Sequence, residues 1–299
     1  MNLEKSAEKK GTSPVFILLV VTLAAVSASI CMNKVSPIMP ILMKSFKIRE
    51  AQGGLLISVF SIIGIFLAIP GGIVIQKLGV WKAGIIGLAA IIAGSLIGTY
   101  SSSFTPLLVT RIIEGIGMAL LSVVGPVIIG MTFSPEKRGR AIAIFTTYVT
   151  LGQFIMLILA PRLSGVYGWK GVWWFVTIYA AIFFIIWFFA IRSIGGSPNA
   201  DEAAPNNTQI DNDTNPAPSA LKSKSVWILT ITGCLFITSL MSVMFFLPTY
   251  LNLVRGMEMS SASGMVSIVA MLGIPFTIVG GTLSDKLGSR RWFSIVFIV

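Results

Sequence analysis

The sequence predicts an all-α membrane protein built from two related helical halves, the second of them incomplete. Three observations lead to this fold class. Of the 299 residues 55% are hydrophobic and 11% are charged, whereas soluble domains carry about a quarter charged residues. Several long stretches contain no charged residue, and a polar turn that begins at Gly71 is repeated 209 residues later. Because about 20 apolar residues cross a bilayer as a helix, we expect a multi-pass membrane protein.

Eight candidate spans follow one another along the chain. They are residues 15–33, 51–76, 83–110, 115–135, 141–161, 171–191, 225–254 and 259–284. The turn YSSSFTP at 100–106 separates the third span from the fourth. The charged N-terminal segment is followed by an apolar run too long for a signal peptide, so we interpret that run as the first span.

Lysine and arginine are distributed unevenly between the two ends of these spans. With the N-terminus in the cytoplasm, cytoplasmic segments hold 14 of the 22 basic residues and outer segments hold six. This bias favours a cell-membrane protein with a cytoplasmic N-terminus, and it accounts for the net charge of +11 without a nucleic-acid partner. Both cysteines, Cys31 and Cys234, fall within spans and histidine is absent, so no disulfide, metal site or other cofactor is expected.

The chain divides into an N-terminal six-helix half (14–192), a cytoplasmic linker (193–224) and an incomplete C-terminal half (225–299). The linker is rich in Pro, Asn and Asp and lacks apolar periodicity. Residues 209 apart then pair across the linker: Ser58 with Ser267, Gly64 with Gly273, Gly71 with Gly280, Gly72 with Gly281, Lys77 with Lys286, Leu78 with Leu287 and Gly79 with Gly288. Such a parallel repeat is one way in which transporters are built.

The C-terminal residues 292–299 are apolar and predict the start of a ninth span. Eight residues at ~1.5 Å each would extend only about 12 Å, against a hydrocarbon core of about 30 Å. We therefore expect the second half to lack the rest of span nine and three further spans.

Polar residues are sorted unevenly among the spans. The third and sixth spans hold few of them, and we expect these spans to face lipid. Three other spans carry polar stripes at helical spacing: Ser27, Cys31 and Lys34 in the first, Thr146, Thr150 and Gln153 in the fifth, and Thr238, Ser242, Phe245, Thr249 and Asn252 in the seventh. Such stripes either join helices or line a wet cavity, and three together favour a cavity.

The repeated turn carries a resemblance to a known family, the major facilitator superfamily. The second copy matches the family signature at Gly281, Asp285, Lys286, Gly288, Arg290 and Arg291. The first copy keeps Gly72, Lys77, Gly79 and Lys82 but has Gln76 in place of the acid and Trp81 in place of a base. The segments RIIEGIG (111–117) and FSPEKRGRA (133–141) also resemble family elements.

The resemblance implies a secondary transporter that works by alternating access, with two pseudo-symmetric six-helix halves around a central site. In such a carrier the two glycine-rich loops would act as conformational switches, and the glycines would permit tight turns. Since Gln76 carries no charge, the first loop cannot act there as a charged latch. The segment NKVSPIMP (33–40) is weakly similar to the cyanate and nitrate carriers.

Three ionisable residues lie within spans, where charge is costly and by default indicates a functional site: Lys34, Arg111 and Glu114. Arg111 and Glu114 are three residues apart on a helix and are expected to pair. Lys34 would then be an unpaired cation that binds an anionic substrate with help from Asn33, while Glu114, or its pair with Arg111, responds to protonation. Arg111, Gln153, Thr238 and Ser242 complete the predicted binding site. The alternative is a structural pair and a lysine that snorkels to the outer surface.

Three functions remain open from the sequence. The first is uptake of a small anion coupled to a proton or another ion by a monomer in the bilayer. The second is export of a drug or metabolite, although the fifth span, TLGQFIMLILAPRL (150–163), lacks the Gly-Pro-rich signature of the drug antiporters. The third is a non-transporting sensor with a carrier fold. An enzyme is not expected, because no catalytic set of side chains is present.

Overall fold

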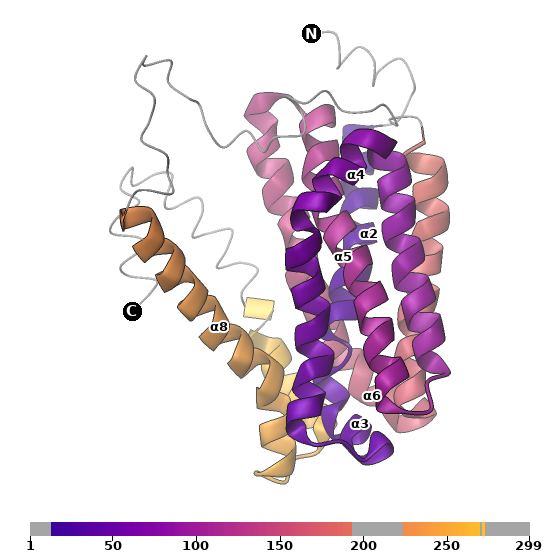
Figure 1. Ribbon diagram of the computed structural model, residues 1–299, viewed down its shortest axis with the longest axis vertical. Coiled ribbons are helices and arrows are strands. Elements are labelled where there is room, and N and C mark those ends of the chain that lie inside the picture. Colours follow the sequence, from indigo (N-terminus) through magenta and orange to yellow (C-terminus); the bar gives the residue numbers. More distant parts are fainter. Residues whose placement is uncertain (1–12, 193–223, 270, 273–299) are drawn as a thin grey trace.

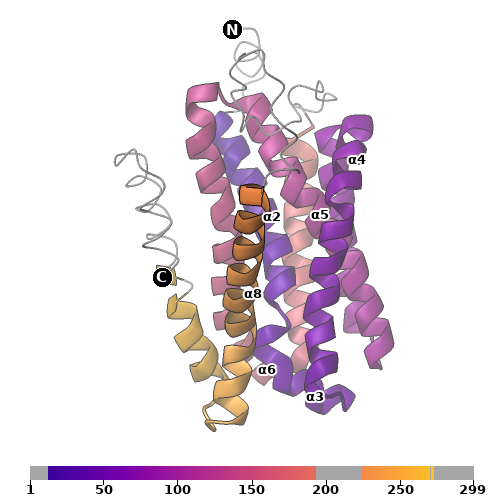
Figure 2. The same ribbon diagram turned by 60° about the vertical axis from the view of Figure 1, so that its left-hand side comes forward.

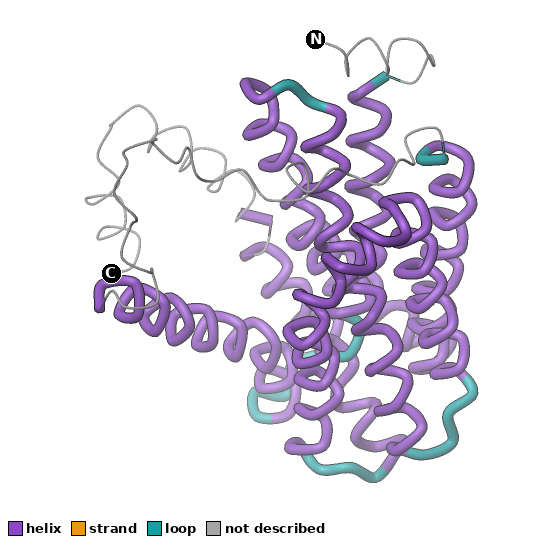
Figure 3. Tube along the Cα trace, turned by 45° about the horizontal axis from the view of Figure 1, so that its top comes forward, coloured by secondary structure: helices purple, strands orange, loops and turns teal. Residues whose placement is uncertain are grey.

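The computed structural model describes residues 13–192, 224–269 and 271–272, and these consist of helices joined by short turns, without a strand among them (Figure 3). The helices are α2 (Pro14–Asn33), the short 3-10 helix η1 (Ser36–Ile38), α3 (Met39–Phe46), α4 (Glu50–Thr99), α5 (Phe104–Thr132), α6 (Pro135–Ala190) and α8 (Lys224–Leu253), followed by a short apolar helix, Met259–Val269. Within the described residues, six helical segments are long and apolar enough to cross a membrane: five in the first half, where Lys137–Ala190 is counted once although it has 54 residues, and Thr230–Leu253 of α8. The predicted all-α membrane fold is confirmed.

Two of these helices are too long for one crossing. α4 has 50 residues and α6 has 56, and each contains one glycine with a non-helical, positive-φ backbone: Gly79 (φ 79°, ψ 162°) and Gly168 (φ 66°, ψ −177°). Only glycine adopts such angles readily. α4 folds back at Gly79, since Leu56 before it and Ser95 after it both contact residues of the same turn of α5. Each long helix is therefore two spans joined without a loop, and all six spans predicted for residues 14–192 are present.

α2, α4, α5 and α6 form a compact bundle around a common apolar core (Figure 1). Small residues allow its helices to approach closely. A Cβ added to Gly117 of α5 would lie 2.5 Å from the carbonyl oxygen of Gly87 in α4, and one added to Gly152 of α6 would lie 2.4 Å from Ser29 of α2. This tight packing fixes the rotation of each helix and therefore decides which side chains face the interior.

α8 contacts this bundle at one end and diverges from it toward the other (Figures 1 and 2). At the contact, the Ser36 hydroxyl of η1 donates a hydrogen bond to the Phe245 carbonyl, and a Cβ on Gly54 would lie 3.6 Å from the Phe246 ring. Leu157 of α6 and Val266 are buried together beside them. We call these three contacts the seam. Away from the seam, every side chain from Thr230 to Leu240 is exposed.

The seam also relates the two halves of the sequence. Ser36 and Phe245 are 209 residues apart, which is the offset of the sequence repeat. The contact therefore joins the segment that follows α2 in the first half to α8 in the second half.

Several predictions concern residues outside the described ranges. These are the linker 193–223, residues 270 and 273–284 of the eighth span, the start of a ninth span, and the second copy of the polar turn with Gly281, Asp285, Lys286, Gly288, Arg290 and Arg291. Lys224, predicted as the end of the linker, is the first residue of α8.

Candidate functional site

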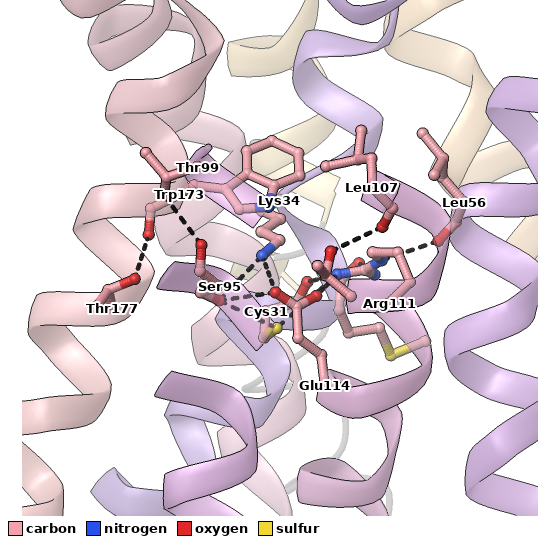
Figure 4. A network of polar contacts seen from close by, with 12 residues as sticks. Cys31, Lys34, Leu56, Ser95, Thr99, Leu107, Arg111, Glu114, Trp173 and Thr177 are labelled. Carbon is pink, nitrogen blue, oxygen red and sulfur yellow. Dashed lines mark hydrogen bonds and ion pairs between the residues drawn. The ribbon is translucent and has the colours of Figure 1, made fainter. Parts of the chain in front are cut away.

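The three predicted intramembrane charges meet inside the N-terminal bundle. Lys34 follows the last residue of α2, while Arg111 and Glu114 lie one helical turn apart on the inward face of α5 (Figure 4). Ser95, from the second span of α4, lies beside them. All four side chains are fully buried, with 0% of their surface exposed. We call these four residues the buried cluster.

Glu114 is the centre of the buried cluster. Its Oε1 lies 2.5 Å from Lys34 Nζ, and its Oε2 lies 2.6 Å from Arg111 Nη1. The predicted pairing of Arg111 with Glu114 is confirmed. The expectation that Lys34 is an unpaired cation is wrong, because the packing of α2 on α5 brings the ammonium group to the free oxygen of the same carboxylate. The alternative of a snorkelling lysine is also wrong, since the side chain does not reach the surface.

Arg111 is fixed mainly by backbone groups. Its Nε donates to the Leu56 carbonyl (2.9 Å), its Nη1 to the Cys31 carbonyl (2.9 Å) and its Nη2 to the Met32 carbonyl (3.5 Å). The last carbonyls of a helix have no intrahelical donor, and α2 ends at Asn33, so Arg111 caps this helix end. The Phe60 ring lies 4.4 Å from the guanidinium carbon.

Lys34 has a different set of partners. Besides Glu114 it donates to the Ser95 hydroxyl at 3.1 Å, and the Trp173 ring of α6 lies 4.4 Å from Nζ. The Ser95 hydroxyl in turn donates to Glu114 Oε1 at 2.8 Å. No backbone carbonyl bonds Lys34 among the described residues. The ammonium group is therefore held by side chains alone, and of these only Glu114 carries a charge.

Two cations and one carboxylate leave the buried cluster with one net positive charge. The two pairs of Glu114 are the only ion pairs among the described residues. A buried excess charge is costly unless something compensates it. Such a cluster can therefore accept an anion, and it can also accept a proton on Glu114 when an anion is present.

The remaining predicted binding residues lie outside the buried cluster. Asn33 donates to the Ser29 carbonyl of its own helix, 2.9 Å away. Gln153 is half-buried on α6, and Thr238 and Ser242 are exposed on α8, where Ser242 bonds the Thr238 carbonyl. None of these four bonds a member of the buried cluster. The stripe of Ser27, Cys31 and Lys34 is buried within the bundle and lines no open surface.

The first of the two predicted switch loops surrounds the reversal of α4. Gly79 forms that reversal, which agrees with the tight turn expected there. Gln76, Lys77 and Lys82 are exposed, and Gly72 has no atom within 4 Å of the position of an added Cβ. Its counterpart after the eighth span lies outside the described residues.

Sequence reasoning missed two residues of the site, Ser95 and Trp173. Both lie on spans expected to face lipid. Their outward faces are indeed exposed and apolar, as at Ile97 and Ile178, but Ser95 and Trp173 point inward. The signal was present for Ser95, which is the only polar side chain among residues 83–98. A lone hydroxyl in an apolar helix bonds inward more cheaply than it faces lipid.

Comparison with known proteins agrees with the fold. The family model described as Major Facilitator Superfamily matches residues 17–299. The chain is 26% identical over 288 residues to the probable nitrate transporter NarT of Staphylococcus haemolyticus, covering 95% of this chain and 70% of that protein. It is 22% identical to the probable anion transporter 6 of Oryza sativa subsp. japonica, over 83% of this chain and 60% of that protein.

One similarity is stronger but more local. Over 114 residues, 38% of this chain, it is 33% identical to the multidrug transporter mfsC of Aspergillus fumigatus, covering 22% of that protein.

Among solved structures, a bacterial homologue of the lysosomal transporter Spinster in an inward-facing, occupied conformation superposes with a TM-score of 0.72 at 20% identity, over 95% of this chain and 64% of that one. The chain thus spans at most 70% of the length of these four proteins. Since the family model covers almost all of its residues, the chain belongs to the major facilitator superfamily.

Proposed function

We propose that this protein is a secondary active transporter that takes up a small anion together with a proton by alternating access. The observation that carries the proposal is the buried cluster, in which Glu114 holds two cations and one net positive charge remains. The similarity to probable nitrate and anion transporters over most of the chain supports an anionic substrate. The basic-residue bias supports a cytoplasmic N-terminus.

The two cations are suited to different tasks. Arg111 is anchored by three backbone carbonyls, so it stays in place if Glu114 loses its charge. Lys34 is held by Glu114, Ser95 and the Trp173 ring, so protonation of Glu114 removes its strongest partner. Lys34 is therefore the residue that we assign to the substrate anion, and Arg111 the residue that keeps Glu114 in place.

Charge balance couples the proton to the anion. Protonation of Glu114 alone would leave two buried cations, and each lost pair is worth about 4 kcal/mol at 4 Å in a medium of effective dielectric 20. A bound monoanion restores the original net charge of +1. Each ligand thus favours the other, which is the thermodynamic requirement for symport.

Uptake of nitrate into proteoliposomes with an acidic exterior tests this proposal. Lys34→Gln should raise the KM for nitrate about 10- to 100-fold, because a hydrogen bond to a charged group contributes about 1.5–3 kcal/mol. Glu114→Gln should abolish accumulation driven by the pH gradient. Lys170→Gln is the matched control, since Lys170 also lies over a tryptophan ring but is exposed and has no ion pair among the described residues. An unchanged KM in Lys34→Gln would reject the anion assignment.

Export is the second candidate, favoured by the local similarity to a multidrug transporter. Inverted membrane vesicles separate the two directions. An exporter would accumulate a cationic dye in them under an imposed pH gradient, whereas an anion symporter would accumulate nitrate in right-side-out vesicles.

A further inference from the structure

The first span, which in the structure continues past Asn33 as Pro14–Phe46, is broken at the residue that binds Glu114. α2 ends at Asn33, Lys34 and Val35 lie between helices, and the chain resumes as η1 and then α3. Pro37 lacks the N–H group that would otherwise bond the Asn33 carbonyl and continue the helix. At the end of α2, Arg111 bonds the carbonyls of Cys31 and Met32. The break is therefore stabilised by the same arginine that pairs with Glu114.

The segment beyond the break makes the seam. Ser36 is two residues after Lys34, so their Cα atoms are at most about 7 Å apart. The Ser36 hydroxyl donates to the Phe245 carbonyl on α8. η1 and α3, although part of the first span, therefore contact the second half of the molecule, while α2 packs within the first half.

We propose that this break transmits the charge state of the buried cluster to the seam, with Ser36 as the positioning residue. While Glu114 holds Lys34, the segment from Lys34 to Ile38 is fixed and Ser36 bonds α8. When Lys34 turns toward a bound anion, the segment shifts, the Ser36 bond to Phe245 breaks, and the two halves separate at this end. The inference rests on the proposed function, because it assigns the release of Lys34 to anion and proton binding.

The geometry favours a direct link over a distributed one. No helical turn intervenes between Lys34 and Ser36 to absorb a displacement, and both side chains are buried. The side chains that contact Lys34 come from three helices: Glu114 of α5, Ser95 of α4 and Trp173 of α6. All of them lie on the bundle side of the break, whereas Phe245 lies across the seam.

Pulsed EPR distances across the seam test this link. Spin labels at Ser45→Cys and Val254→Cys, both exposed positions, would be measured in nanodiscs in a Cys234→Ser background. Ser36→Ala should raise the ratio of the long-distance to the short-distance population roughly three- to tenfold, as expected for one lost hydrogen bond. Ser36→Thr, which keeps the hydroxyl, should restore the parent distribution. Lys34→Gln should raise the ratio in the same direction.

A control and a parallel assay separate the possible failures. Ser164→Ala removes a buried hydroxyl that bonds the Pro161 carbonyl within α6 at 2.9 Å, and it should leave the distances unchanged. If Ser36→Ala matches the parent, or if Ser36→Ala widens the distance while Lys34→Gln does not, the link is wrong. If Lys34→Gln widens the distance but the nitrate KM is unchanged, the link stands and the proposed function fails.

Discussion

Ser95 contributes a single hydroxyl, which accepts a hydrogen bond from Lys34 and donates one to Glu114. Because both partners are charged and buried, water cannot replace this group. Ser95→Ala should therefore lower the free energy of unfolding by about 1–3 kcal/mol, measured by thermal denaturation in detergent micelles. Ser122→Ala, which removes a hydroxyl bonded only to the Ala119 carbonyl of its own helix, should cost clearly less. Equal losses in the two variants would mean that Ser95 does not support the charges.

At this scale the sequence predicted which charges lie inside the membrane better than how they are connected. Charge inside an apolar span is costly, so Lys34, Arg111 and Glu114 could be identified without a structure. Helical spacing also predicted the contact between Arg111 and Glu114. The contact of Lys34 with Glu114 joins residues 80 apart, and it depends on the rotation of α2 relative to α5, which no local pattern encodes.

The reversal of α6 depends on one backbone conformation. Gly168 has φ 66° and ψ −177°, a region that essentially only glycine occupies, and no atom lies within 4 Å of the position of an added Cβ. Gly168→Ala should therefore cost about 1–3 kcal/mol of stability through backbone strain alone. Gly165→Ala, three residues earlier in the helix and equally open, should be neutral or slightly stabilising. Thermal unfolding of the two variants would contradict this account if both behaved alike.

The elements themselves were largely predictable. Uninterrupted apolar runs gave six spans for the first half, and the glycine-rich motif gave the turn at Gly79. The end of the predicted first span at Asn33 coincides with the end of α2, but the continuation of this crossing as η1 and α3 was not predicted. The group that bonds the last carbonyls of α2 is Arg111, which lies 79 or more residues away in sequence.

Over the whole molecule, the predicted orientation places the turn at 101–103 outside the cell and the turn at 133–134 inside. Ser102→Cys and Gly139→Cys, both at exposed positions, test this orientation in a Cys234→Ser background. A membrane-impermeant maleimide should label Ser102→Cys in right-side-out vesicles and Gly139→Cys only in inverted ones. Cys31 is buried and should remain unlabelled in both. The opposite labelling pattern would reverse the orientation and with it the direction assigned to the proton gradient.

The sequence repeat predicted two related halves, but it could not place them relative to each other. The separation of the two halves depends on the stability of the contacts at the seam. That stability is a small free-energy difference between two packed states.

The net positive charge of the buried cluster has an electrical consequence. Any displacement of this cluster along the membrane normal carries one elementary charge through part of the transmembrane potential, and a full crossing would correspond to about 2.3 kcal/mol per 100 mV. The empty and the fully loaded carrier would bear the same charge, because a proton and a monoanion cancel. In the proposed symport, the membrane potential would then leave the final accumulation ratio of the anion unchanged. It would speed either the inward movement of the loaded carrier or the return of the empty carrier and slow the other.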